Sequence, residues 1–405
     1  MNRRDFFGVL AGTAVAGAFA KWPERVLAQS GPVISRVGGT LADGSSITIS
    51  GSAFGMKPVA APLKYDDFQS LSIGQDLRYG GWWMNGSYVN QMDYGHPPRY
   101  QTPPVASNER VRPSTPYTRN AKCVWDAATP DNQSSSFHLA NVPFSKGHPL
   151  YLDFWTYPDC LTTGQTFSGS GDNVKPLRIH NNPDYSPNIY FGHWAKSIGP
   201  AIVAGRDGVG MNVHRPGEDD GWAPVTCGGI NNSAWYPTAY FDKWNHIQIV
   251  AEANTPSVFD GTWTIYWDGV LRFNRPGNIM LFSDGITASP TSDVYLGNWT
   301  RIAAGTFRQY WEAVYIDTSW ARVELGNNPV YANCTHREIQ IPSAWSSSDI
   351  TVRLNRGSFA PNSLAYLFVT NSSNVASTGY PVTLGAEGAA PTASAPSPPR
   401  GVIIR

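Results

Sequence analysis

Short runs of alternating apolar and polar residues, separated by Gly, Pro, Asn and Asp, dominate the chain after residue 28. Side chains two positions apart share one face of a β-strand, so this alternation predicts strands with one buried face. In residues 244–252, for example, Ile247 and Ile249 would face a core. Helical periodicity is nearly absent, and the pattern therefore predicts an all-β fold.

One pair of strands is predicted by its turn. Residues 263–273 read WTIYWDGVLRF, in which Asp268 and Gly269 separate two alternating runs. Asp-Gly is a preferred two-residue hairpin turn, because both positions tolerate the positive φ angles that this turn requires. An antiparallel hairpin is expected here, followed by a further strand over residues 311–317.

These strands also carry a family resemblance. The stretch WNHIQIVAE…GTWTIYWDGVLRF…YWEAVYID, between residues 244 and 317, resembles the concanavalin A-like lectin and glucanase sandwich in the style of laminin-G-like modules. The resemblance implies a concanavalin-like jelly-roll sandwich over about residues 62–330. Such a likeness indicates the fold more directly than the function.

Two distant segments resemble the halves of one small domain. PVISRVGGTLADGSSITISGSAFG, at 32–55, resembles the opening of an immunoglobulin-like domain of the IPT/TIG type, and the matching piece lies at 337–384. About 280 residues separate the two. We therefore expect a small immunoglobulin-like β-sandwich, residues 31–56 and 335–386, with the concanavalin-like domain inserted in it.

The N-terminus predicts export. Residues 2–7 (NRRDFF) resemble a twin-arginine motif, and the apolar stretch that follows is too short to span a bilayer. Residues 1–28 are expected to be a twin-arginine signal peptide, which would place the protein in the periplasm or outside the cell. No other apolar run is long enough for a membrane span. The Ala-, Pro- and Ser-rich residues 387–405 are expected to be a disordered tail.

The composition indicates which kinds of molecule the protein is expected to bind. Thirty Lys and Arg balance thirty Asp and Glu, which argues against nucleic acid, a partner that favours a basic surface. The 15 Trp and 19 Tyr suit polysaccharide binding, although sandwich cores also use aromatic residues. The four cysteines suit disulfides in an oxidising compartment, with three pairings open: Cys123, Cys160, Cys227 and Cys334.

Polar and aromatic side chains on the middle strands form the predicted binding surface. On a concave sheet, aromatic rings would stack on sugars and polar groups would bind hydroxyls; the alternative is a solvated convex face. The residues assigned to substrate binding are Tyr151, Asp153, Trp155, Tyr157 and Gln248, on a face expected to include Arg178, His180, Tyr190, His246 and Glu252.

A second constellation suits β-elimination, since several lyases of acidic polysaccharides share the concanavalin-like fold. Such lyases use a cation to neutralise the uronate carboxylate, a base to take the C5 proton and an acid to protonate the leaving oxygen. Arg178, His180 and Tyr190 supply these groups within thirteen residues, and Tyr185 lies between them. The predicted catalytic residues are therefore Arg178, His180 and Tyr190.

Glycoside hydrolysis is not favoured. It needs two carboxylates roughly 5–9.5 Å apart, which sandwich glucanases place on one strand as Glu-x-Asp-x-(x-)Glu. That spacing is absent, and Glu312 and Asp317 would point to opposite faces of a regular strand.

No cofactor is required by these predictions, although laminin-G-like domains often hold a structural Ca²⁺. The carboxylates that could bind it are those of residues 65–67 and 218–220, Asp293 and Asp317.

Three functions thus remain open at the level of sequence. We expect recognition of an extracellular polysaccharide, with a lyase acting on a uronate-containing polymer as the first alternative. A structural adhesin or cell-surface component is the second alternative. Whether the protein is an enzyme is left undecided by the sequence.

Overall fold

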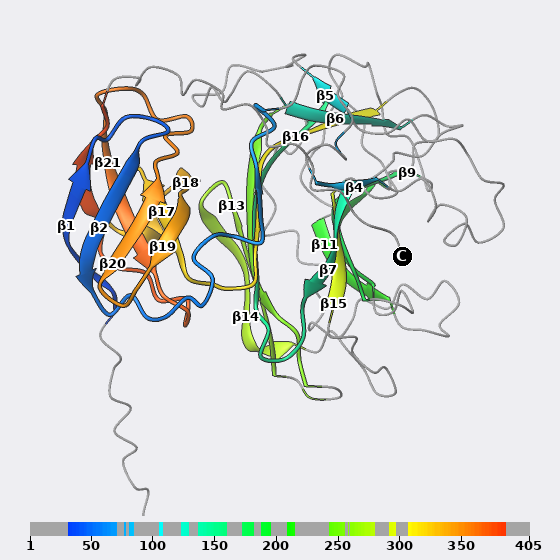
Figure 1. The fold of residues 1–405 in the computed structure, drawn as a ribbon. Coiled ribbons are helices and arrows are strands. Elements are labelled where there is room, and N and C mark those ends of the chain that lie inside the picture. The colour runs from blue at the N-terminus through cyan, green and yellow to red at the C-terminus, as the bar shows by residue number, and fades with distance from the viewer. Residues whose placement is uncertain are drawn as a thin grey trace, which may run out of the picture. The chain divides into compact units, whose positions relative to one another are not determined.

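The computed structural model describes the residues 31–70, 77, 81–84, 105–107, 123–128, 137–159, 172–181, 188–195, 209–214, 243–255, 258, 260–279, 291–296 and 307–385. The predicted signal peptide and tail lie outside this part of the chain. Within it, nearly all regular structure is β, in four antiparallel sheets (Figure 1), with a short 3-10 helix, η3 (Tyr331–Asn333). The predicted all-β fold class is confirmed.

The six-stranded sheet has the order β11-β10-β9-β15-β7-β4. Its strands are β4 (Trp83–Met84), β7 (Phe137–Pro143), β9 (Asp172–Asn181), β10 (Asn188–Ala195), β11 (Val209–His214) and β15 (Thr291–Leu296).

The eight-stranded sheet has the order β14-β13-β12-β8-β16-β6-β5, and β3 also pairs with β16. Its strands are β3 (Lys64–Asp66), β5 (Val105–Ser107), β6 (Cys123–Ala128), β8 (Leu150–Asp159), β12 (Asn245–Glu252), β13 (Gly261–Trp267), β14 (Val270–Ile279) and β16 (Phe307–Asp317).

These two sheets pack through their apolar faces to form the large sandwich. Phe137 of the six-stranded sheet meets Trp311 of the eight-stranded sheet edge to face, with ring centroids 5.5 Å apart. Leu177 and Ile179 lie on the same face as Phe137, and each is 1% exposed. Burial of each such side chain contributes about 1.5–3 kcal/mol. The polar positions that alternate with them therefore lie on the outer face of the six-stranded sheet.

The predicted hairpin is confirmed. Trp267 pairs with Val270, and the turn between them is Asp268-Gly269. Both turn residues have positive φ angles, 49° and 73°, as a type I′ turn requires.

Two four-stranded sheets form the small sandwich, in the orders β1-β2-β20-β19 and β18-β17-β21-β22. The strands are β1 (Val33–Gly39), β2 (Ser46–Ser52), β17 (Arg322–Gly326), β18 (Arg337–Ile339), β19 (Ile341–Trp345), β20 (Asp349–Arg353), β21 (Leu364–Thr370) and β22 (Tyr380–Thr383).

The first and last segments of the described chain meet in this sandwich. β2 pairs with β20, with Ile47 opposite Val352 and Ile49 opposite Ile350. All four side chains are buried in one apolar core. The two distant segments therefore form one sheet. Membership of the IPT/TIG family stays a prediction.

The boundary between the sandwiches differs from the one expected. The sequence prediction assigned residues up to 330 to the large sandwich, whereas β17 pairs with β18 and β21 in the small one. The apolar side chains of β17, Val323 and Leu325, belong to the small core. Its polar side chains, Arg322 and Glu324, face the other way, toward Tyr151 and Gln248 of the large sandwich.

Cys334 is a free, buried thiol that donates a hydrogen bond to the carbonyl oxygen of Asn328 at 3.3 Å. A disulfide at Cys334 is therefore not formed. The side chains of the other three cysteines lie outside the described part of the chain. Among the described residues, no helix is long and apolar enough to cross a membrane.

Candidate functional site

The structure divides the predicted binding surface between two sheets. Tyr151, Asp153, Trp155 and Tyr157 lie on β8 and Gln248 lies on β12, both in the eight-stranded sheet. The predicted catalytic positions lie on β9 and β10, in the six-stranded sheet. The expectation of one common surface was wrong, because alternation shows which residues share a strand face but not which sheet the strand joins.

Within the eight-stranded sheet, the predicted substrate-binding residues do share a face. Asp153 pairs with Gln248 and Trp155 with His246 across β8 and β12. The Asp153 carboxylate is 2.8 Å from His246 Nε2, and it accepts hydrogen bonds from Tyr151 at 3.1 Å and Gln248 at 2.9 Å. The Trp155 and His246 rings stack with centroids 4.5 Å apart.

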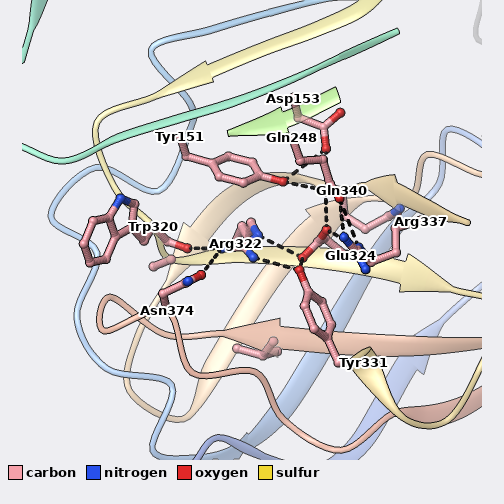
Figure 2. Close-up of polar contacts among 12 residues, drawn as sticks. Tyr151, Asp153, Gln248, Trp320, Arg322, Glu324, Tyr331, Arg337, Gln340 and Asn374 are labelled. Atoms are coloured by element: carbon pink, nitrogen blue, oxygen red, sulfur yellow. Dashed lines mark hydrogen bonds and ion pairs between the residues drawn. The ribbon is translucent and has the colours of Figure 1, made fainter. Parts of the chain in front are cut away.

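The small sandwich packs against this face. Figure 2 shows Arg322, Glu324 and Arg337 reaching Tyr151 and Gln248. Gln248 Nε2 donates to Glu324 at 2.7 Å, and Arg337 Nε donates to Gln248 Oε1 at 3.1 Å. The Arg322 guanidinium lies 4.4 Å from the centre of the Tyr151 ring. The network therefore joins the two sandwiches through charged hydrogen bonds and a cation–π contact.

Glu324 is the centre of this network. It accepts from Arg322 at 2.8 Å and from Tyr331 at 2.8 Å, and it lies 3.3 Å from Arg337. Burial works to raise the pKa of Glu324, but Arg322 and Arg337 hold it below its usual value. The carboxylate therefore remains ionised inside the interface.

We call this surface the closed face. Its members are almost inaccessible to solvent: Tyr151 0%, Asp153 1%, Trp155 3%, Tyr157 0% and Gln248 1%. An open sugar-binding surface is not found at these five residues, which corrects the sequence prediction. The physical reason is β17, whose Arg322 and Glu324 alternate with core residues and so present charge to the closed face.

The outer face of the six-stranded sheet has a different arrangement. Its register places Tyr190 opposite Arg178, Arg178 opposite Tyr295, and Tyr295 opposite His138. Directly opposed residues in antiparallel strands share a face. Arg178, Tyr190, Tyr295 and His138 therefore form one row across four strands, which we call the outer row.

His180 lies next to the outer row. It is two residues from Arg178 on β9, opposite Asn188 on β10 and opposite Asp293 on β15. The backbone thus brings the three predicted catalytic positions, Arg178, His180 and Tyr190, together on one face. Their side chains lie outside the described part of the structure.

His138, Tyr295 and Asp293 are described in full. The rings of His138 and Tyr295 stack with centroids 4.4 Å apart, and both are buried. Burial lowers the pKa of His138 to about 4, so its imidazole is neutral at neutral pH. Burial raises the pKa of Asp293, although the Asn141 amide and the Tyr295 hydroxyl donate to its carboxylate.

Sequence reasoning did not assign His138 or Tyr295 to the site. Each lies in an ordinary alternating strand, and only the pairing of β7, β15 and β9 brings them into one row with Arg178. No local signal could have identified them.

Two of the predicted calcium ligands, Asp66 and Asp317, have other partners. Asp66 accepts hydrogen bonds from Trp82 and the Phe68 amide, both at 2.8 Å. Asp317 forms an ion pair with Lys57 at 2.6 Å. A carboxylate neutralised by lysine does not suit Ca²⁺. Within the described residues, no three His, Cys, Asp or Glu side chains form a metal-binding group. Residues 218–220 lie outside that part of the chain.

Comparison with known proteins gave neither a family model nor a curated protein that matches the chain. Solved structures are similar at low identity. The endo-β-1,4-glucuronan lyase of the fungus Trichoderma reesei is 10% identical with a TM-score of 0.35, over 62% of this chain and 96% of the lyase. The cellulose-induced protein Cip1 is 12% identical with a TM-score of 0.39, over 63% and 97%. An alginate lyase from Aplysia kurodai is 13% identical with a TM-score of 0.32, over 49% and 84%. At these values no residue role is transferred.

Proposed function

We propose that the protein is a polysaccharide lyase that cleaves a uronate-containing polymer by β-elimination. The observation that carries the proposal is the register of the six-stranded sheet, which gathers Arg178, His180 and Tyr190 on one face. The closed face is excluded as the binding surface because Arg322, Glu324 and Arg337 of the small sandwich occupy it. Export by residues 1–28 belongs to the same proposal and would bring the enzyme to an extracellular polymer.

Each position has a distinct role in the proposed reaction. The Arg178 guanidinium binds the uronate carboxylate, which stabilises the negative charge that develops when C5 loses its proton. His180 takes that proton as general base, and the C5–H electrons form the C4=C5 double bond. The C4–O bond breaks, and Tyr190 protonates the departing oxygen. The product carries an unsaturated sugar at its new end.

The outer row supports these roles. Tyr295 and His138 continue the row beyond Arg178, and both rings are buried. We therefore assign them to the support of Arg178 rather than to contact with the polymer. His138 is neutral at neutral pH, so it adds no positive charge to the outer row.

The test is incubation with a panel of uronate polymers while the absorbance of the unsaturated product is followed. We expect product from at least one polymer, and a loss of about 10²-fold or more in kcat with His180→Ala and with Tyr190→Phe. His148→Ala is the matched control, because His148 is exposed on the loop between β7 and β8. Absence of product across the panel would overturn the proposal.

A second candidate is recognition of the same polymer without cleavage. The outer row favours this candidate, because a cation flanked by aromatic positions suits an acidic sugar. Such binding does not require a base that removes the C5 proton. Affinity electrophoresis in gels containing each polymer distinguishes the two: retardation that depends on Arg178, with no unsaturated product, identifies a binding protein.

A further inference from the structure

Lys57 is a buried lysine on the segment that leads from the small sandwich to the large one. That segment runs from the end of β2 at Ser52 to the start of β3 at Lys64. The Lys57 ammonium lies 2.6 Å from Oδ2 of Asp317, the last residue of β16, after which the chain returns to the small sandwich at β17. The pair therefore joins the two connections between the sandwiches, although about 260 residues separate its members.

The Lys57–Asp317 pair is buried beside an aromatic ring. The Lys57 side chain is 1% exposed and that of Asp317 is 4% exposed. The Lys57 ammonium also lies 5.5 Å from the centre of the Trp345 ring. Two full charges are costly to bury even when they are paired. Burial accordingly lowers the pKa of Lys57 and raises the pKa of Asp317, which favours the neutral amine and the neutral carboxylic acid more than water does.

Tyr315 connects the two groups through its hydroxyl. Lys57 Nζ donates to the Tyr315 oxygen at 3.4 Å, and the Tyr315 hydroxyl donates to Asp317 Oδ2 at 2.8 Å. The Tyr315 ring contacts the rings of Tyr65 and Tyr151 edge to face. Burial raises the pKa of Tyr315 well above its usual value, so the hydroxyl keeps its proton near neutral pH. A proton can therefore pass from the nitrogen to the carboxyl oxygen through one hydroxyl group.

We propose that Lys57 and Asp317 form an intramolecular amide bond, a covalent cross-link between the two connections. The ammonium gives one proton directly to Oδ2 of the carboxylate. The lone pair of the resulting amine attacks Cγ and forms the C–N bond. The nitrogen gives a second proton to the Tyr315 hydroxyl, which passes its own proton to Oδ2. The Cγ–Oδ2 bond breaks with its electrons on the oxygen, and one water molecule leaves.

A second ion pair of this protein provides a matched comparison. Lys243 Nζ lies 2.6 Å from Asp268 Oδ2, the same separation as in the Lys57–Asp317 pair. The Lys243 and Asp268 side chains are 27% and 34% exposed, so water stabilises their charged forms. An ammonium has no lone pair with which to attack a carboxylate. We therefore expect no amide bond between Lys243 and Asp268.

The cross-link would close the large sandwich into a covalent ring. The strands from β3 to β16 all lie between Lys57 and Asp317 in the chain. A cross-link that closes a long loop restricts the unfolded chain and so stabilises the folded one. The bond would also hold the two connections together when strands of the large sandwich separate. Its formation does not depend on the proposed lyase activity.

Mass spectrometry of the full chain tests the bond. The protein is reduced and denatured, and its mass is compared with that of Lys57→Arg, which keeps the positive charge but lacks the amine. We expect the unmodified protein to be one water molecule lighter than its sequence from the N-terminus found in the sample. The variant should have its full sequence mass. A full sequence mass in the unmodified protein would overturn the proposal.

Peptide mapping locates the bond. Digestion of the unmodified protein should release one branched peptide that contains Lys57 and Asp317. The peptides that contain Lys243 and Asp268 should be linear, because that pair differs from the first in its exposure and not in its separation. A water lost at any other pair of residues would contradict the assignment to Lys57 and Asp317.

Tyr315→Phe tests the proton route. The variant keeps the ring beside Tyr65 and Tyr151 but removes the hydroxyl. In protein sampled at short intervals after synthesis, we expect the branched peptide to appear about 10-fold more slowly or less. Appearance at the rate of the unmodified protein would overturn the role assigned to Tyr315.

Discussion

The two outer faces of the large sandwich carry the same kinds of side chain but differ in what surrounds them. The closed face has Tyr, Asp, Trp, His and Gln residues, and β17 and β18 of the small sandwich bury them under Arg322, Glu324 and Arg337. The outer face of the six-stranded sheet has Arg, His, Tyr and Asp positions in register. Residue type alone therefore does not identify a site. On the closed face, contact with the small sandwich means that the polar groups stabilise the fold.

The largest expected loss of stability comes from removing the charge at the centre of the closed face. Glu324→Leu leaves Arg322 and Arg337 buried without their carboxylate. We expect a loss of about 3–5 kcal/mol in the free energy of unfolding, measured by chemical denaturation.

The control for that prediction is Glu252→Leu at the edge of the same sheet. Glu252 pairs with Lys146, whose side chain is 41% exposed, so the pair is partly screened by solvent. A loss below about 1 kcal/mol is expected. Equal losses in the two variants would show that the closed face is not held by its buried charges.

A pH titration of stability tests the outer face of the six-stranded sheet. His138 beside the outer row has a pKa lowered to about 4, against 6.5 when unfolded. As the pH falls, His138 therefore takes up a proton in the unfolded chain before it does so in the folded protein. The free energy of unfolding decreases as the pH falls from 6.5 towards 4. His138→Phe keeps a ring on Tyr295 and removes this titration.

We expect the unmodified protein to lose about 3 kcal/mol more than His138→Phe between pH 7 and pH 4. Denaturant unfolding at each pH measures the difference. Parallel pH profiles would mean that His138 titrates as an exposed histidine does.

The smallest expected effect is at Gln248, which bridges the two sandwiches. Gln248→Leu removes a hydrogen-bond donor from the carboxylates of Asp153 and Glu324. We expect a loss of about 1–3 kcal/mol in the free energy of unfolding. In a double-mutant cycle with Glu324→Gln, a coupling of about 0.5 kcal/mol or more is expected. Strict additivity would contradict a shared network.

Much of the fold followed from local pattern. Alternation located the strand from Asn245 to Glu252, and Asp268-Gly269 located a hairpin, because both signals depend only on neighbouring residues. The pairing of residues 32–55 with 337–384 was expected from resemblance rather than from pattern.

The site could be predicted only in part. Arg178, His180 and Tyr190 were chosen by residue type, and the register places them on one face. The burial of Tyr151 and Gln248 could not be foreseen, because it depends on β17, about 75 residues beyond Gln248 in the chain. Contacts of that kind are set by which sheets pack together, and period-two alternation does not encode this.

The central claim is that the chemistry belongs to the six-stranded sheet and not to the closed face. Its most direct test is the rate of unsaturated-product formation from a uronate polymer in two variants. Arg178→Ala removes the cation of the outer row, whereas Tyr157→Phe removes a hydroxyl from the closed face and keeps the ring in its core. We predict a loss of about 10²-fold or more with Arg178→Ala and an unchanged rate with Tyr157→Phe. Full activity in Arg178→Ala, together with loss of activity in a folded Tyr157→Phe, would contradict the account.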